Sequence, residues 1–149
     1  YGQIIEMLPE YKVSIRNLED RLREEDANAG SFYCNYDVFK NIYQINARSV
    51  RRARSVRFLV LLTLETDVHN PEIQGKIKTD MEILKKVIFE QLRRNDVFTQ
   101  FSATQYSLIL TAQNRDNCVT AITRLVNRFK QKSKDSPFEL QWDMKQVEG

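Results

Sequence analysis

The sequence has little glycine, proline, cysteine or histidine, and each shortage argues against a class of protein. With 4 glycines and 3 prolines in 149 residues, a loop-rich β-sandwich is disfavoured. The two cysteines, Cys34 and Cys118, stand far apart and neither belongs to a Cys-x-x-Cys pair, so we expect both to be reduced and buried or half-buried in a cytoplasmic protein. Because His69 is the one histidine, no zinc site and no other metal or cofactor is expected.

Long hydrophobic runs and a strong charge of one sign are also missing. No apolar run reaches the ~18 residues of a membrane span, and no signal-peptide pattern opens the sequence, so we expect no membrane partner. A net charge of +3 is too small to indicate nucleic-acid binding by itself. The length suits one domain with an appendage, and the start at Tyr1 leads us to expect a piece of a longer protein.

The appendage is a predicted helix within residues 1–25. Tyr11, Ile15, Leu18 and Leu22 recur at spacings of four, three and four and form a narrow apolar stripe, while Pro9 breaks or kinks the helix. The stripe suits either a helix docked on the domain or a linker that signals from an upstream domain or forms a homodimer. The sequence leaves these two open. We therefore divide the chain into a connector, residues 1–30, and a domain, residues 31–149.

The domain shows alternating strand and helix patterns, preceded by an extra helix at about 36–54 that Asn35 caps. The predicted elements that follow are an apolar strand at 58–64, a helix after Asn70, hairpin strands at about 97–101 and 106–112, a helix from Asn114, and an edge strand at 138–144. The first strand is a continuous apolar run and is expected to be buried on both faces. The order is the α+β, ferredoxin-like βαββαβ arrangement, with an antiparallel sheet and both helices on one face.

The hairpin carries the pattern that ties this order to a known family. Arg93-x-x-Asp96 ends a helix and is followed by five residues and then by Ser102, Ala103, Thr104, Gln105 and Tyr106. Order and hairpin together resemble the GGDEF (diguanylate cyclase) domain of the nucleotide-cyclase fold, over roughly residues 31–145. In that family Arg-x-x-Asp leads through a short strand into Gly-Gly-Asp-Glu-Phe.

The family's signature residues are replaced here. Ser102 and Ala103 stand for the turn glycines, and Gln105 stands for the metal-binding Glu. The strand that ends in Asp-x-Asp in the family has Thr63 and Glu65 at those positions. Two Mg²⁺ ions that hold a triphosphate need several carboxylate oxygens, so the resemblance implies no cyclase activity and no catalytic residues.

A looser resemblance concerns Gly30 to Phe39, the arginine-rich helix end and Leu61 to Leu64. These segments look like a divergent GGDEF-like module at the C-terminus of bacterial transcriptional regulators, behind a bacterial transcriptional activator domain. The resemblance implies a non-catalytic signalling module in the bacterial cytoplasm. Its partner would be an upstream domain of the same chain, reached through residues 1–25.

Three other functions compete with this one. Arg93 and Asp96 stand where the family binds cyclic di-GMP, which suggests a receptor, although a cation at a helix end and an Asp in a turn are also common structural features. Glu65, Asp67 and His69 suggest a residual nucleotide-processing enzyme, although a solvated loop explains them too. A basic helix end suggests nucleic acid but lacks a stacking platform, so we expect no direct nucleic-acid binding by this domain. Its residues are Arg48, Arg51, Arg52, Arg54 and Arg57.

Overall fold

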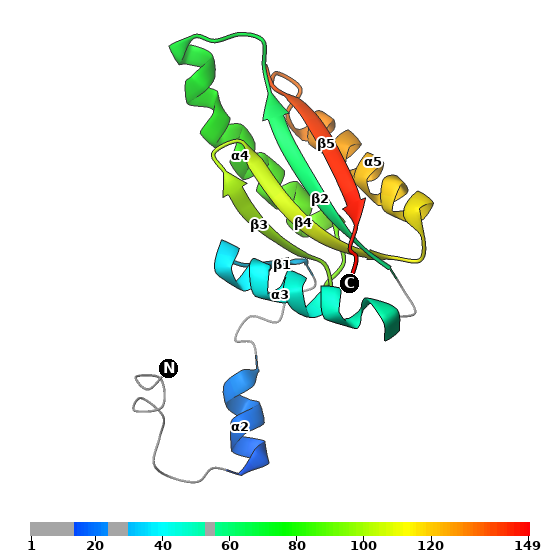
Figure 1. Ribbon diagram of the computed structural model, residues 1–149. Helices are drawn as coiled ribbons and strands as arrows, with labels where there is room; N and C mark the ends of the chain where they lie inside the picture. Colours follow the sequence, from blue (N-terminus) through cyan, green and yellow to red (C-terminus); the bar gives the residue numbers. More distant parts are fainter. Residues whose placement is uncertain (1–13, 24–29, 53–55) are drawn as a thin grey trace.

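The computed structural model describes residues 14–23, 30–52 and 56–149, which form a five-stranded sheet and the helices around it (Figure 1). In chain order the elements are α2 (Ile15–Leu22), β1 (Phe32–Tyr33), α3 (Tyr36–Ser49), the 3-10 turn η1 (Val50–Arg52), β2 (Val56–Glu65), α4 (Pro71–Gln91), β3 (Val97–Ser102), β4 (Gln105–Ala112), α5 (Arg115–Lys132) and β5 (Glu139–Gln146). From β2 onward this order confirms the predicted βαββαβ arrangement.

Three asparagines begin the long helices, as their local sequences predict. The side-chain oxygens of Asn35, Asn70 and Asn114 each accept a hydrogen bond from the backbone N–H three residues later, at 2.9 Å. This satisfies one of the donors that every helix leaves free at its start. Pro71 follows Asn70 at the first helical position, where a missing N–H costs nothing.

The sheet has the strand order β1-β3-β4-β2-β5. β2 lies between β4 and β5 and is antiparallel to both, and β3 and β4 form the predicted antiparallel hairpin. β5 is an edge strand, as its half-buried pattern predicts. β1 is parallel to β3 and forms the other edge.

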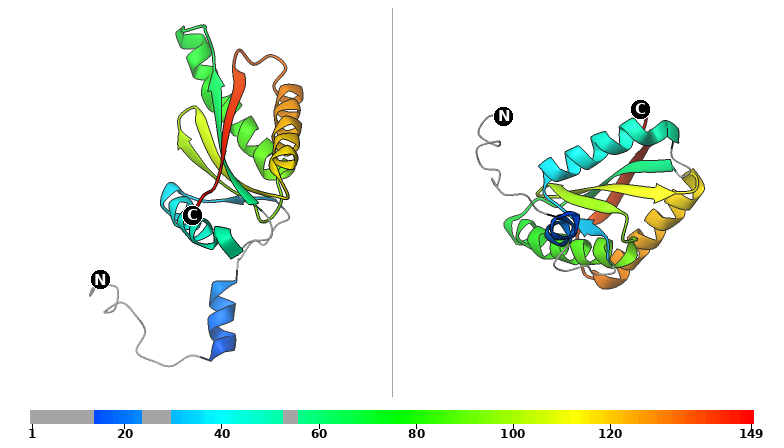
Figure 2. Two further views of the ribbon diagram at one scale, coloured as in Figure 1. Left: turned by 45° about the vertical axis from the view of Figure 1, so that its right-hand side comes forward. Right: turned by 90° about the horizontal axis from the view of Figure 1, so that it is seen from below.

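The two faces of the sheet are covered differently. α4 and α5 pack on one face and α3 lies on the other (Figure 2). On β2, the residues Phe58, Val60 and Leu62 are fully buried toward α4 and α5, whereas Leu59 and Leu61 on the opposite side are half-buried. The prediction that this strand is buried on both faces is therefore wrong for the α3 face, because one helix covers only part of it.

Two elements near α3 differ from the prediction. β1 was not predicted, since two residues are too few to show a strand period. The strand forms only by pairing with a segment far away in the sequence. The Phe32 N–H donates to the Asp96 carbonyl oxygen at 2.9 Å, and the Cys34 N–H donates to the Phe98 carbonyl oxygen at 3.0 Å. The α-helical part of α3 ends at Ser49 and continues as η1, and the rest of the predicted helix, residues 53 and 54, lies outside the described residues.

The predicted N-terminal helix is described only at Ile15–Leu22, and Pro9 and Tyr11 lie outside the described residues. Ser14 caps it by accepting a hydrogen bond from the Asn17 N–H at 3.2 Å. No residue of α2 is buried, and Ile15 and Leu22 are 80% and 74% exposed. The interpretation in which this stripe docks on the domain is not what the structure shows, and the linker interpretation stays a prediction.

Both cysteines are free and buried, as predicted. Burial raises the pKa of the Cys34 thiol and raises that of Cys118 to about 11, with the nearby Asp96 adding to the second shift and Arg115 opposing it. These thiols behave as small apolar side chains. Among the described helices, none combines the length and apolar character needed to cross a membrane.

Candidate functional site

The hairpin turn is built without glycine. β3 ends at Ser102 and β4 begins at Gln105, so Ala103 and Thr104 form the turn. No residue of the described chain has a positive φ, and the turn is held instead by the Ser102 hydroxyl, which accepts from the Thr104 N–H at 3.3 Å. The Leu64 N–H donates to the Thr104 carbonyl oxygen at 2.9 Å and fixes the turn against β2.

The positions that would hold metal in a GGDEF domain do come together here. Thr63 of β2 lies directly opposite Gln105 of β4 in the register of the sheet. The Gln105 side-chain amide donates to the Thr63 hydroxyl oxygen at 3.1 Å, and the Ser102 hydroxyl donates to the Gln105 side-chain oxygen at 2.9 Å. The result is a closed network of three neutral side chains, which we call the hairpin network.

Tyr106, the last residue of the replaced signature, points the other way into the core. It is 1% exposed, and its hydroxyl donates to the Met81 carbonyl oxygen on α4 at 3.0 Å. Burial raises the pKa of the Tyr106 hydroxyl, and nearby Tyr33 and Glu82 raise it further. Tyr106 therefore anchors β4 to α4 and is closed to a ligand.

Glu65, Asp67 and His69 do not form a cluster. Glu65 is the exposed last residue of β2, and Asp67 and His69 are exposed in the loop that follows. In the part of the chain that the structure describes, no three His, Cys, Asp or Glu side chains lie close enough together to hold a metal ion. The structure gives this loop no feature of a catalytic centre.

The Arg93 to Asp96 segment is a turn closed by the Asp96 side chain. One carboxylate oxygen of Asp96 accepts from the Arg93 N–H at 2.9 Å, and the other accepts from the Thr111 N–H on β4 at 3.0 Å. Asp96 is 4% exposed, and burial raises its pKa against the opposing effects of these two hydrogen bonds and of the Arg93 charge. The carboxylate thus joins the turn to β4, with one hydrogen bond accepted by each of its oxygens.

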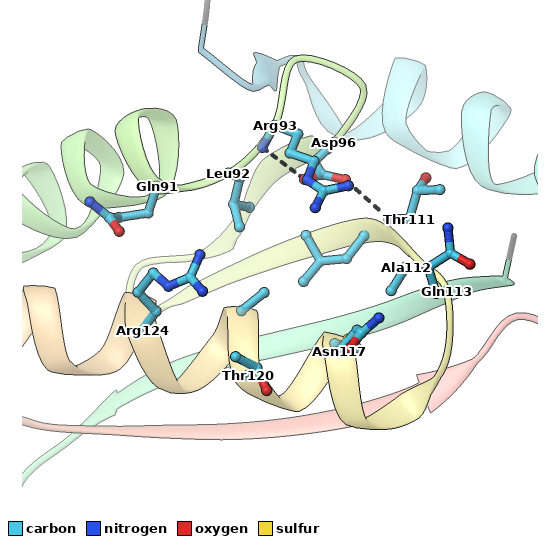
Figure 3. Close-up of a pocket in the computed structure, with 13 residues that line it drawn as sticks. Gln91, Leu92, Arg93, Asp96, Thr111, Ala112, Gln113, Asn117, Thr120 and Arg124 are labelled. Atoms are coloured by element: carbon cyan, nitrogen blue, oxygen red, sulfur yellow. Dashed lines mark hydrogen bonds between the residues drawn. The ribbon is translucent and has the colours of Figure 1, made fainter.

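Arg93 itself is exposed and lines a cavity of about 290 Å³ between the end of α4, β4 and α5 (Figure 3). Arg124 reaches this cavity from α5, together with the polar side chains of Asn117 and Thr120. We call it the Arg93 cavity. It brings two guanidinium groups to one hollow, and guanidinium groups bind phosphate or a guanine edge well.

Arg124 was missed from the sequence, although a signal was present. Asn117, Thr120 and Arg124 are spaced by three and four residues, which places them on one face of the predicted helix. The periodicity gives the shared face, but only the packing of α5 beside β4 shows that this face meets Arg93.

The basic helix end is described only in part. Arg48 and Arg51 are exposed and Arg57 is half-buried, whereas Arg54 and the side chain of Arg52 lie outside the described residues. Within the part of the chain that the structure describes, no ion pair joins Arg48, Arg51 or Arg57 to an acid.

Several solved structures resemble this fold, and two of them are GGDEF or DGC proteins. The GGDEF domain of FimX from Pseudomonas aeruginosa matches with a TM-score of 0.60 and 14% identity, over 76% of this chain and 75% of that chain. A DGC protein from Thermotoga maritima matches with a TM-score of 0.56 and 14% identity, over 81% of this chain and 85% of that chain. The sequence matches no family model and no curated protein. The chain therefore has the GGDEF-like nucleotide-cyclase fold that the hairpin predicts, and at this identity the likeness concerns the fold alone.

Proposed function

We propose that the chain is a non-catalytic regulatory module of a larger bacterial transcriptional regulator and that it makes no cyclic di-GMP. The hairpin network carries this proposal. Thr63 and Gln105 occupy the positions of two metal-binding carboxylates, yet they offer neutral oxygen and nitrogen atoms that already bond to each other. Magnesium ions that hold a triphosphate prefer anionic oxygen ligands, and these side chains supply none.

The contacts around Asp96 support a relay function. The Ser31 hydroxyl donates to the Ile88 carbonyl oxygen at 3.2 Å and its N–H donates to the Phe89 carbonyl oxygen at 3.2 Å, which fixes the start of the domain on α4. The next residue, Phe32, donates to the Asp96 carbonyl oxygen. A change at the Arg93 cavity would thus act directly on the segment that follows the connector, residues 1–30.

The absence of cyclase activity is tested by incubation with GTP and Mg²⁺, followed by anion-exchange chromatography of the nucleotides. We expect unchanged GTP, because no carboxylate pair is available to bind the metal ions. An active diguanylate cyclase run in parallel shows that the assay detects product. Formation of cyclic di-GMP that is lost in Gln105→Ala would overturn the proposal.

The Arg93 cavity favours a second candidate function, a receptor for cyclic di-GMP or another nucleotide. Calorimetric titration with cyclic di-GMP tests it, with Arg93→Ala as the site variant and Arg94→Ala as the matched control, because Arg94 is equally exposed and does not line the cavity. Binding that Arg93→Ala removes and Arg94→Ala keeps would establish the receptor. Absence of binding by the wild type would exclude a cyclic di-GMP receptor and would leave the regulatory module.

A further inference from the structure

A second cavity, of about 300 Å³, lies on the α3 face of the sheet, away from the Arg93 cavity. Its walls come from α3, through Tyr36 and Tyr43, and from the sheet, through Leu61 and Phe101. We call it the aromatic cavity. Its volume stands at the lower end of the range for small-molecule sites, and its predominantly apolar walls with few polar groups are typical of such sites.

Two aromatic rings at this cavity contact each other and leave about half of their surface exposed. Tyr36 and Phe101 are 49% and 54% exposed, and their ring centroids lie 5.8 Å apart. Phe101 sits at the register shift between Gln100 and Ser102, where it has no cross-strand partner on β4. The bulge leaves the large apolar ring of Phe101 exposed to water at the cavity, which is unfavourable. A planar ring bound in the cavity would cover this apolar surface.

Two polar groups of the cavity are also without partners. Ser107 on β4 lines the cavity, and its hydroxyl oxygen is open to solvent and makes no hydrogen bond to a described residue. Lys40 on α3 lines the same cavity and forms no ion pair within the described part of the chain. Asp143 lies in the same row of the sheet, paired with Leu61, but does not line the cavity. A hydroxyl without a protein partner can donate a hydrogen bond to a ligand, and an unpaired ammonium attracts an anion.

We propose that the aromatic cavity binds a small planar aromatic molecule that carries an anionic group, such as an aryl carboxylate. The ring of the ligand packs against Tyr36 and Phe101, the Ser107 hydroxyl donates a hydrogen bond to an oxygen atom of the ligand, and Lys40 neutralises its charge. This site shares no residue with the hairpin network or the Arg93 cavity, so the inference holds whether or not the chain turns over GTP.

Titration of the full chain with 2-naphthoate, followed by calorimetry and by ¹H–¹⁵N chemical shifts, tests the proposal. The neutral 2-naphthamide is the charge control for the ligand. We expect naphthoate to bind with a Kd of about 1 mM or tighter, and naphthamide to bind more weakly. Phe101→Ala should weaken naphthoate about tenfold through loss of the ring contact. Lys40→Gln should remove the preference for naphthoate, whereas Lys76→Gln, an exposed lysine of α4, should change nothing.

Several results would overturn the proposal. They are absence of naphthoate binding, equal affinity for the amide, and binding that Phe101→Ala leaves unchanged. Phe101 is half exposed, so its variant should fold, and the thermal midpoint checks this. Sedimentation supplies the remaining outcome: a wild-type dimer that Phe101→Ala dissociates would show that a second copy of the chain fills the cavity.

Discussion

The two faces of the sheet differ in how extensively they are packed. The face under α4 and α5 holds one continuous cluster of 18 buried residues, whereas the face under α3 has a buried cluster of four, Cys34, Phe39, Val97 and Ile109. The well-packed face fixes the fold. The loosely covered face carries the hairpin network and the aromatic cavity, whereas the Arg93 cavity lies beside α4 and α5.

Equal truncations on the two faces should have very unequal effects. Leu84 on α4 is 0% exposed, and Leu84→Ala should lower the free energy of unfolding by about 2–5 kcal/mol. Leu59 faces α3 and is half-buried, so Leu59→Ala should cost only about 1 kcal/mol. Urea denaturation followed by circular dichroism measures both. Equal losses would show that the α3 face is as tightly packed as the other.

The Asp96 carboxylate should be the most important polar group at the junction of the elements. Asp96→Asn keeps the size of the side chain, but its NH₂ group cannot accept from the Arg93 or Thr111 N–H. We expect a loss of about 1–3 kcal/mol in the free energy of unfolding. Asp67→Asn, at an exposed loop position, is the control and should have no measurable effect. A neutral outcome for Asp96→Asn would contradict the structural role of this carboxylate.

Acidic residues at positions 63 and 105 should make the stability of the domain depend on a bound metal ion. In the double variant Thr63→Asp, Gln105→Glu, two carboxylates face each other across the strands and should destabilise the metal-free domain by about 1 kcal/mol. Added Mn²⁺ should restore the thermal midpoint, because the ion relieves the repulsion. Thr63→Asn is the neutral control. If the ion stabilises the wild type as much as the double variant, the hairpin network already binds metal.

The smallest effect on stability is expected in α2. Ile15 and Leu22 are exposed, so Ile15→Ser with Leu22→Ser should change the free energy of unfolding of the domain by less than about 0.5 kcal/mol. Under the proposed regulatory function, the same variant should alter transcriptional output if residues 1–25 relay the signal. A marked loss of domain stability would show instead that the stripe docks on the domain in solution.

The separation of interacting residues along the chain explains which features could be predicted from the sequence. Local chemistry sufficed for the caps at Asn35, Asn70 and Asn114 and for the hairpin, because each depends on residues a few positions apart. The prediction missed β1 and missed that Arg93 and Arg124 line the same cavity, because both features arise from the packing of distant segments.

Asp96 is a residue whose role could not be predicted from the sequence alone. Two interpretations were open from the sequence, a ligand-binding acid or a turn residue, and the position of Asp96 in the motif could not separate them. The hydrogen bond from the Thr111 N–H, fifteen residues away, gives the carboxylate a structural role, and its ligand-binding role stays a prediction. The opposition of Thr63 and Gln105 was likewise not predicted, because it depends on the register between β2 and β4, whose paired residues here stand 42 positions apart.

The central claim is that the hairpin network is closed to metal ions, and paramagnetic broadening by Mn²⁺ tests it most directly. In ¹H–¹⁵N spectra of the wild type, we expect the amide signals of Thr63, Gln105 and Ser102 to be no more broadened by Mn²⁺ than those of exposed loops. The Thr63→Asp, Gln105→Glu variant should lose these signals first, which shows that the measurement detects a bound ion. Selective broadening at Thr63 and Gln105 in the wild type would contradict the account, because it would place a divalent ion where the structure has only neutral ligands.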